Sequence, residues 1–420
     1  MKSQDFGRAK KRNKAFALVF SVLLSISWAG SAAATTDFDQ YLVDAADWLL
    51  PFQLPSGAFP FSESDQAVFP NVQAAPGMGM LTAYKASCRL GACNQAFLQS
   101  AIDNADYLIN GGFGNFSPNT GFPRIRAGDP IFFILLSAET GDPQYADFIQ
   151  TFFWGRLSAG IYGPQNNWGI VQYVDSELAR RGAQAGTGEV VAPWDLAFIA
   201  WAADEAGITQ FNAALAEGAR IGLSFATDTD AGRPYVLGSS AYDVVGLAGA
   251  VWIGGLTGLD VAPASGPWSN IPFGNFGLGN LLVSFQSDEG GWLQSSAAGV
   301  SPIDVRDTVS QNTAFAIRAL QSLRRAAYCD SIDRGLNALV DVFQEANGRI
   351  SYFHPTVDLN TVPNPEQFIF THAYAMIPFF MDRPECEPPV AVPVNDWRML
   401  SLLIMLMLAL GCAGLALRRA

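Results

Sequence analysis

The sequence is poor in the residues that most often hold metal ions. Its only histidines are His354 and His372, and no Cys-x-x-Cys pair occurs. Structural zinc sites are built from cysteine and histidine at short spacings. We therefore expect no metal ion and no other cofactor.

Charge is also scarce, and it is unbalanced. Charged residues make up 15% of the chain against 50% hydrophobic residues, and the formal net charge is −13. Strong acidity disfavours nucleic acid as a partner, because phosphates repel a negative protein. A chain of 420 residues with this apolar content can bury a large core.

The N-terminus has the three parts of a secretion signal. Basic residues between Lys2 and Lys14 precede an apolar run over 15–28, and small residues follow up to Ala34. The run is shorter than the roughly 20 residues of a membrane helix, and Ala-x-Ala is typical of signal cleavage. Residues 1–34 are therefore predicted to be a signal peptide. No twin-arginine pair precedes the run, which favours the general secretory route.

A second apolar segment lies at the C-terminus. Residues 399–417 are apolar or small apart from Ser401, and Arg418 and Arg419 follow. This length spans a bilayer, and the positive-inside rule places the arginines in the cytoplasm. We predict a transmembrane helix with an Arg-rich tail over 398–420, preceded by a Pro-rich linker and sorting motif over 384–397.

This C-terminal arrangement resembles the tripartite sorting signals read by bacterial exosortase-type enzymes, in particular the class with an Ile-Pro-Thr-Leu-x-x-Trp motif. Val392-Pro393 and Trp397 match that motif, with one residue fewer between them and without the Thr-Leu pair. The resemblance implies an exosortase-type sorting protease or transpeptidase as a partner. It also implies export through the inner membrane of a Gram-negative bacterium, with the protein membrane-anchored, periplasmic or at the cell surface.

The cysteines fit an exported protein. Cys412 lies in the predicted membrane helix, and an even number remains outside it: Cys88, Cys93, Cys329 and Cys386. An even count in an oxidising compartment favours two disulfides. Pairing of Cys88 with Cys93 and of Cys329 with Cys386 is one of three connectivities, among which the sequence does not decide.

Helical periodicity divides residues 35–383 into six pairs of helices. The first members span 37–52, 95–109, 142–154, 209–225, 277–285 and 332–343, and the second members span 74–86, 129–140, 193–206, 242–253, 308–323 and 367–381. The second members are apolar nearly all round, as in residues 130–136, which is typical of helices buried on every side. We therefore predict an all-α fold, an (α/α)6-like toroid with the second helices as its inner ring. Long Gly- and Pro-rich loops within each pair should then share one rim, where function is expected.

Three segments place a glycine four residues after a glutamine. They are Leu49-x-x-x-Gln53-x-x-x-Gly57-Ala58-Phe59, Leu282-x-x-x-Gln286-x-x-x-Gly290-Gly291-Trp292 and Val340-x-x-x-Gln344-x-x-x-Gly348-Arg349-Ile350. They resemble the Gln-Trp repeat of terpenoid cyclases and protein prenyltransferases, which implies an α/α toroid. The catalytic Asp-x-Asp-Asp of the cyclases and the zinc ligands of the prenyltransferases are absent. The resemblance therefore implies the scaffold without those activities.

Acidic residues at the starts of the second helices are the main catalytic candidates. Asp195 and Asp243 form the best pair for general acid and base catalysis on a glycosidic bond. Their neighbours Trp194 and Tyr242 are aromatic, so they could stack on a sugar ring and raise a carboxyl pKa by desolvation. The alternative is helix capping, since acidic residues are favoured in a first helical turn regardless of function.

The remaining candidates also have structural alternatives. His372 is a catalytic candidate or a hydrogen-bonded core histidine. Gln311, Asn312 and Trp292 are candidate ligand-binding residues, although residues 308–311 have the form of a capping box and tryptophans are often packed in cores. His354, in a loop before Pro355, is predicted to be exposed.

Two functions remain. The first is a ligand-binding or structural surface module of unassigned activity, and it is favoured because no recognised catalytic motif is present. The second is a polysaccharide lyase or glycoside hydrolase acting in a central cavity, with polysaccharide as the partner. A cavity with converging polar groups would favour the enzyme, and one closed by aromatic side chains would favour the module.

Overall fold

The computed structural model describes residues 32–116, 122–185, 194–224, 243–265, 268–294, 304–359 and 368–380. Residues 1–31 of the predicted signal peptide (1–34), the linker and the predicted transmembrane helix lie outside these ranges. Within them, no helix is both long enough and apolar enough to cross a membrane.

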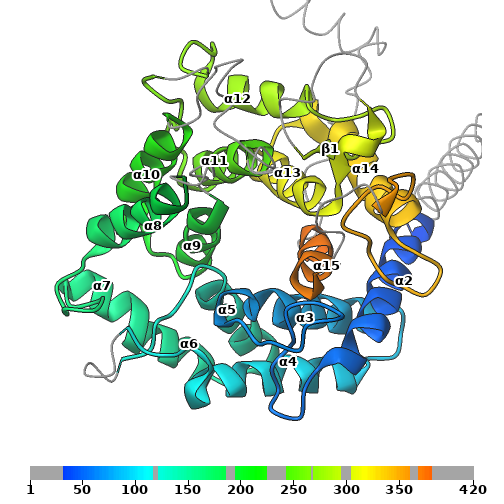
Figure 1. Ribbon diagram of the computed structural model, residues 1–420, viewed down its shortest axis with the longest axis horizontal. Coiled ribbons are helices and arrows are strands. Elements are labelled where there is room, and N and C mark those ends of the chain that lie inside the picture. The colour runs from blue at the N-terminus through cyan, green and yellow to red at the C-terminus, as the bar shows by residue number, and fades with distance from the viewer. Residues whose placement is uncertain are drawn as a thin grey trace, which may run out of the picture.

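Six helices form the inner ring (Figure 1): α3 (Ala74–Arg89), α5 (Asp129–Thr140), α9 (Trp194–Glu205), α11 (Asp243–Thr257), α13 (Ser310–Ser322) and α15 (Ile369–Met376). Each contacts the next, and α15 contacts α3, so the ring is closed. Their side chains are buried on several faces, as in α5, where Ile131, Phe132 and Phe133 are fully buried. This burial explains the nearly continuous apolar sequences of these helices.

The outer layer consists of α2 (Ala32–Leu49), α4 (Gln95–Tyr107), α6 (Gln144–Ile149), α7 (Gly155–Ala159), α8 (Ile170–Ala185), α10 (Asn212–Ser224), α12 (Gly274–Val283) and α14 (Cys329–Ala338). Outer helices bridge inner ones: α10, for example, contacts both α9 and α11. The predicted all-α toroid of hairpins is confirmed. The sequence did not predict α8, which lies in the connection between α7 and α9.

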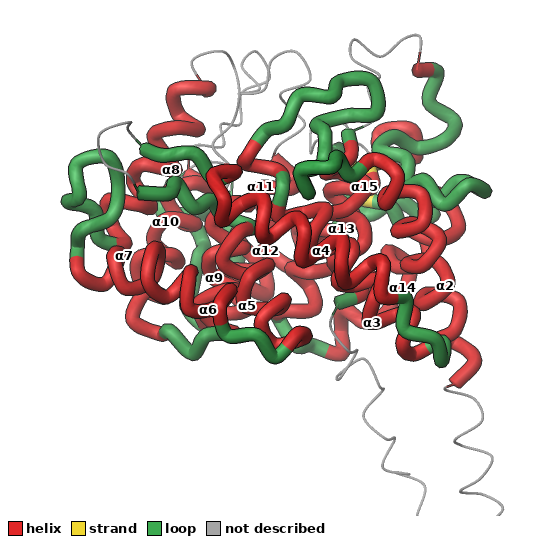
Figure 2. Tube along the Cα trace, turned by 90° about the horizontal axis from the view of Figure 1, so that it is seen from below, coloured by secondary structure: helices red, strands yellow, loops and turns green. Residues whose placement is uncertain are grey.

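Loops divide between the two rims of the ring. Long connections, such as residues 53–73 and 113–128, lead into the inner helices, whereas short ones, such as 90–94 and 141–143, lead out of them. Figure 2 shows the longer loops along one edge of the ring. The N-terminal ends of the inner helices therefore share the long-loop rim, as predicted.

The three Gln-Gly segments share one geometry. In each, the glutamine Nε2 donates to the carbonyl of the glycine four residues later, over 2.9 Å in the first two copies and 3.5 Å in the third. The same Nε2 donates to a carbonyl of another outer helix, that of Ser100, Ser331 or Tyr41, at 2.8, 2.8 and 2.9 Å. The third bond, from Gln344 to Tyr41, joins the last hairpin to the first.

Each repeat requires glycine for two reasons. The φ angles of Gly57, Gly290 and Gly348 are +88°, +95° and +88°, a left-handed region that disfavours other residues. A Cβ at these positions would also lie 2.1, 2.2 and 2.1 Å from a backbone oxygen of the adjoining outer helix. Each repeat therefore joins two neighbouring outer helices, through its glutamine hydrogen bond and the close approach of its glycine.

One predicted disulfide is confirmed. Cys88 and Cys93 are bonded and close the short connection between α3 and α4. Cys329, at the start of α14, is also disulfide-bonded, and Cys386 lies outside the described residues.

Candidate functional site

A pocket on the long-loop rim brings Asp195 together with aromatic and charged side chains. It lies at the N-terminal ends of α5 and α9, and its walls also come from η2 (Pro70–Val72), the loop before α5, and α8 with the residues before it. Its lining residues are Asn71, Phe116, Arg124, Ile125, Arg126, Ala127, Trp168, Tyr173, Glu177 and Asp195.

Half-buried aromatic rings form one side of this rim pocket. The rings of Phe116 and Trp168 meet edge to face with centroids 5.5 Å apart, and Tyr162 contacts Phe116 in the same way at 5.0 Å. Backbone hydrogen bonds of 3.0 and 2.9 Å between Tyr162 and Trp168 fix the tryptophan. The Arg124 guanidinium carbon lies 5.6 Å from the Phe116 ring centroid. The aromatic surface is therefore held in place by protein contacts.

The charged groups of the rim pocket are of both signs. Arg124 and Arg126 line it together with Glu177 and Asp195. Just behind them, Asp129 is buried and accepts a hydrogen bond from the Arg126 backbone N–H at 2.6 Å. Burial raises the pKa of Asp129 to about 7, although that hydrogen bond and the Arg126 charge oppose the shift. The rim pocket is a small depression with a volume of about 40 Å³, and it brings cations and carboxylates together at the surface.

The proposed pair of acids is only partly described. Asp243 is the first residue of α11, but its side chain and Tyr242 lie outside the description. Trp194 is the first residue of α9, is 9% exposed, and is not among the lining residues. Of this group, Asp195 alone is placed in the rim pocket.

His372 is embedded in the scaffold. Its Nδ1 accepts the Ile350 backbone N–H at 2.9 Å, and its Nε2 lies 3.0 Å from the Ala45 carbonyl, so Nε2 carries the proton. Burial lowers its pKa to about 3, which keeps the ring neutral. In the other repeats, Gln73 and Thr313 accept the corresponding backbone N–H. His372 therefore takes the structural role that was its alternative, and it is not carried into the proposed site.

Three candidate ligand-binding residues, Gln311, Asn312 and Trp292, lie on or next to α13, beside a pair of two-residue strands. Asn312 Nδ2 donates to the carbonyls of Leu293 and Gln294 at 2.9 and 3.1 Å, and Trp292 is fully buried, with Nε1 donating to the Leu282 carbonyl at 2.8 Å. Gln311 is half-buried in the first turn of α13. These contacts attach β1 (Trp292–Leu293) to α13, and none of the three residues lines the rim pocket.

Two predictions about this region are wrong. The capping box at 308–311 does not form, because Thr308 pairs with Leu293 in β2 (Thr308–Val309), so that α13 starts only at Ser310 without a side-chain cap. His354 is 5% exposed rather than solvent-exposed. Its Nε2 lies 2.9 Å from Glu289 Oε2 and its Nδ1 2.7 Å from Thr356 Oγ1, and these partners compensate for its burial.

Aromatic side chains fill part of the ring interior. Phe198 of α9 contacts Phe315 of α13 and Tyr374 of α15, with centroids 5.6 Å apart in both pairs. Since α9 is not a ring neighbour of α13 or α15, these contacts reach across the interior. Trp252 of α11 also packs on Phe198 at 5.4 Å. At this level the interior is packed, and the rim pocket lies away from it.

Most of the rim pocket could not be predicted from the sequence. Glu177 lies on helix α8, which the sequence did not predict. Arg124 and Arg126 alternate with apolar residues in a loop, a weak signal that gives no position in space. Within the described ranges, no group of three or more His, Cys, Asp or Glu side chains is placed to hold a metal ion.

No protein-family model matches the chain, and no curated protein is similar in sequence. Among solved structures, a family 88 glycosyl hydrolase from Bacteroides vulgatus has a TM-score of 0.46 and 13% identity, covering 82% of this chain and 98% of that one. An unsaturated glucuronyl hydrolase specific for heparin has a TM-score of 0.48 at 11% identity, covering 82% and 95%. A type II terpene cyclase from Scytonema has a TM-score of 0.43 at 15% identity, covering 84% and 98%. Similarity at this level assigns no activity to the chain.

Proposed function

We propose that the chain is an exported surface module that binds an acidic saccharide residue in the rim pocket. The observation that carries this proposal is the presence of two arginines, two carboxylates and an aromatic surface in one pocket.

Each group has a matching part on such a ligand. The C–H face of a sugar ring packs against an aromatic surface, here that of Phe116 and Trp168. A uronic acid carboxylate pairs with guanidinium, which Arg124 and Arg126 supply. Sugar hydroxyls donate to carboxylates such as Glu177 and Asp195.

Calorimetry with matched sugars tests the proposal. The full chain, purified in a detergent without a sugar headgroup, is titrated with an oligogalacturonate and with the neutral galacto-oligosaccharide of equal length. We expect binding of the acidic sugar, weakened about tenfold or more in Arg124→Gln, because a hydrogen bond to a charged group is lost. Arg306→Gln is the control, since Arg306 is exposed, pairs with Asp304 and does not line the pocket. Equal affinity for both sugars, or no binding, would refute the proposal.

A second candidate is a glycoside hydrolase or polysaccharide lyase, favoured by the presence of Glu177 and Asp195 in the same pocket. Two carboxyl groups can divide general acid and base roles on one glycosidic bond. A polysaccharide panel should then be turned over by the wild-type chain and lose turnover in Glu177→Gln and Asp195→Asn. Asp243→Asn tests the pair favoured by the sequence. Equal turnover in all four proteins would remove these acids from the reaction.

Export and sorting complete the proposal. The basic and apolar N-terminal residues, the C-terminal apolar segment and its arginines support an exported protein attached to the membrane and processed by an exosortase-type enzyme. The Cys88–Cys93 disulfide supports an oxidising compartment. N-terminal sequencing of the protein from a membrane fraction should begin just after Ala34. A mature chain that still starts at Met1 would contradict export by a cleaved signal.

A further inference from the structure

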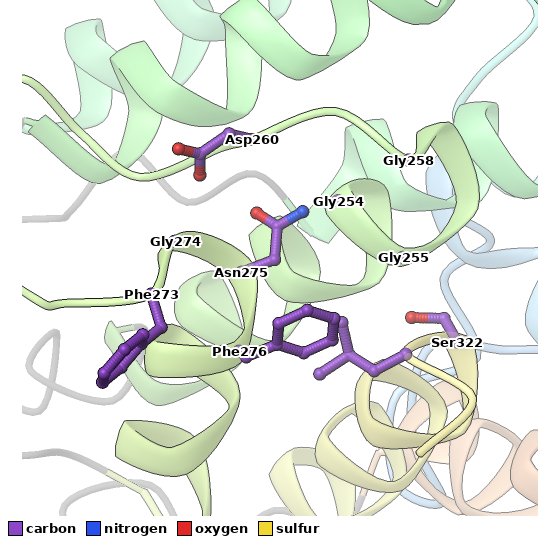
Figure 3. A pocket seen from close by; sticks show the side chains of 10 residues that line it. Gly254, Gly255, Gly258, Asp260, Phe273, Gly274, Asn275, Phe276 and Ser322 are labelled. Atoms are coloured by element: carbon purple, nitrogen blue, oxygen red, sulfur yellow. The ribbon is translucent and has the colours of Figure 1, made fainter. Parts of the chain in front are cut away.

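A second pocket lies on the opposite rim, where the inner helices end (Figure 3). Its volume is about 410 Å³, and it is formed by the end of α11, the start of α12 and the end of α13. The connection from α11 to α12 supplies Gly258, Asp260 and Phe273 to its wall, and with the residues 258–273 it is longer in sequence than 90–94, 141–143 or 323–328 on the same rim. This connection is therefore extended where the other connections are short.

Phe273, which lines this pocket, has an unusual backbone conformation. Its φ of +71° and ψ of +20° are left-handed, a region that a bulky side chain rarely adopts. The residue is 81% exposed, so burial in the core does not compensate for the strained backbone. Phe276, less than one turn later, is 37% exposed. Strained backbone of this kind clusters at active sites and ligand-binding sites.

The polar groups of the pocket are mainly hydrogen-bond acceptors. Asp260 Oδ1 accepts the Ala262 backbone N–H at 3.0 Å, while its Oδ2 makes no hydrogen bond to the described residues. At the end of α11 the Gly254 carbonyl accepts the Gly258 N–H at 3.0 Å, whereas the Gly255 carbonyl accepts no hydrogen bond from the described residues that follow the helix. Asn275 stabilises the wall, because its Nδ2 donates to the Leu259 carbonyl at 2.7 Å and its Oδ1 accepts the Val261 N–H at 2.9 Å.

Charge around the pocket disfavours ionic ligands of either sign. An anion would face the Asp260 carboxylate and the negative end of α11. An organic cation would face Arg325, whose guanidinium carbon already lies 3.9 Å from the Phe276 centroid, and Arg220, which donates to the Asp260 carbonyl at 3.0 Å. The best match is a neutral ligand with many hydroxyl donors and an apolar face.

We propose that this pocket binds a neutral hexopyranose residue. The C–H face of the sugar stacks on Phe273 and Phe276, and its hydroxyls donate to Asp260 Oδ2 and to the Gly255 carbonyl. The volume falls in the range of roughly 300–1,000 Å³ that is usual for small-molecule sites. This site is separate from the rim pocket and differs from it in ligand charge.

The test titrates the full chain, in a detergent without a sugar headgroup, with cellotetraose, maltotetraose and mannotetraose by calorimetry and saturation-transfer NMR. We expect at least one to bind, and Phe273→Gly to weaken binding by about tenfold or more. The same substitution should raise the melting temperature, because glycine tolerates the left-handed backbone. Loss of binding in a more stable protein cannot come from unfolding.

Further variants separate this site from the rim pocket. Asp260→Asn keeps an acceptor for the Ala262 N–H and should weaken sugar binding. Leu259 is an exposed apolar residue that does not line the pocket, so Leu259→Ala should leave sugar binding unchanged. Arg124→Gln should leave neutral sugar binding unchanged, so that failure of one site is distinguishable from failure of the other. Absence of binding to all three sugars would overturn the proposal, as would binding unaffected by Phe273→Gly or a dimer that this variant dissociates in light scattering.

Discussion

Replacing Gly290 by alanine probes how tightly the Gln-Gly repeats join neighbouring hairpins. Gly290 has a φ of +95°, and a Cβ there would lie 2.2 Å from the Arg334 carbonyl oxygen. The left-handed backbone costs alanine about 1–2 kcal/mol, and overpacking against the rigid backbone of α14 adds about 1–3 kcal/mol. Gly290→Ala should therefore lower the free energy of unfolding by about 2–5 kcal/mol.

Gly91 provides a matched control. It also has a φ of +95°, but no atom lies within 4 Å of its Cβ position. Gly91→Ala should therefore lose only the backbone contribution of about 1–2 kcal/mol. Urea titrations followed by tryptophan fluorescence give both free energies, and equal m-values show that they can be compared.

Equal destabilisation by the two substitutions would refute this reasoning. The approach of Gly290 to Arg334 would then add nothing beyond the backbone conformation. If Gly290→Ala lowers the free energy of unfolding by less than the expected amount while Gly91→Ala behaves as expected, α14 moves away from the new Cβ at little cost. The hairpins would then not be rigidly joined.

Three further substitutions test the scaffold in the same assay. Gln344→Ala removes the bond to Tyr41 and should cost about 1–3 kcal/mol, whereas the exposed Gln99→Ala should change little. Because burial lowers the His372 pKa from 6.5 to about 3, the unfolded state takes up the proton first as pH falls, and stability declines from pH 6.5 towards 3. His372→Gln, which imitates Gln73, should reduce this decline, and an unchanged slope would contradict the assignment. Burial raises the Asp129 pKa from 3.8 to about 7, so its contribution is present below pH 3.8 and is lost as pH rises through 7. Asp129→Asn should therefore become more stabilising relative to wild type between pH 4 and 8, and a constant difference would exclude this titration.

The ring was predictable because the burial of each helix is reflected in the hydrophobic pattern of its own sequence. Inner helices such as α5 are buried on several faces, so their sequences are apolar nearly throughout, and the outer helices keep one apolar stripe. In α8, by contrast, Tyr173, Val174 and Leu178 are buried while the rest is largely polar. Its periodic signal is weak, and the helix was missed. The Gln-Gly repeats were identified because all their parts lie within eleven residues of sequence.

The candidate site was less predictable, because it is assembled from distant segments. Asn71, Phe116, Trp168 and Asp195 meet only when several hairpins are in place, and no local pattern encodes that approach. In the sequence, His372 is a catalytic candidate and Asn312 a candidate ligand-binding residue. Both are instead bonded to backbone groups, which is the usual state of buried polar side chains.

The bond from Gln344 to Tyr41, together with the contact of α15 with α3, has a consequence for biosynthesis. The first hairpin has an open apolar flank until the last one has been made, so an emerging chain stays incomplete until nearly all of it has been synthesised. Stalled or truncated chains would display that flank to chaperones and proteases. Linking the last hairpin to the first and opening the chain between two other hairpins should, in turn, yield a circular permutant that folds.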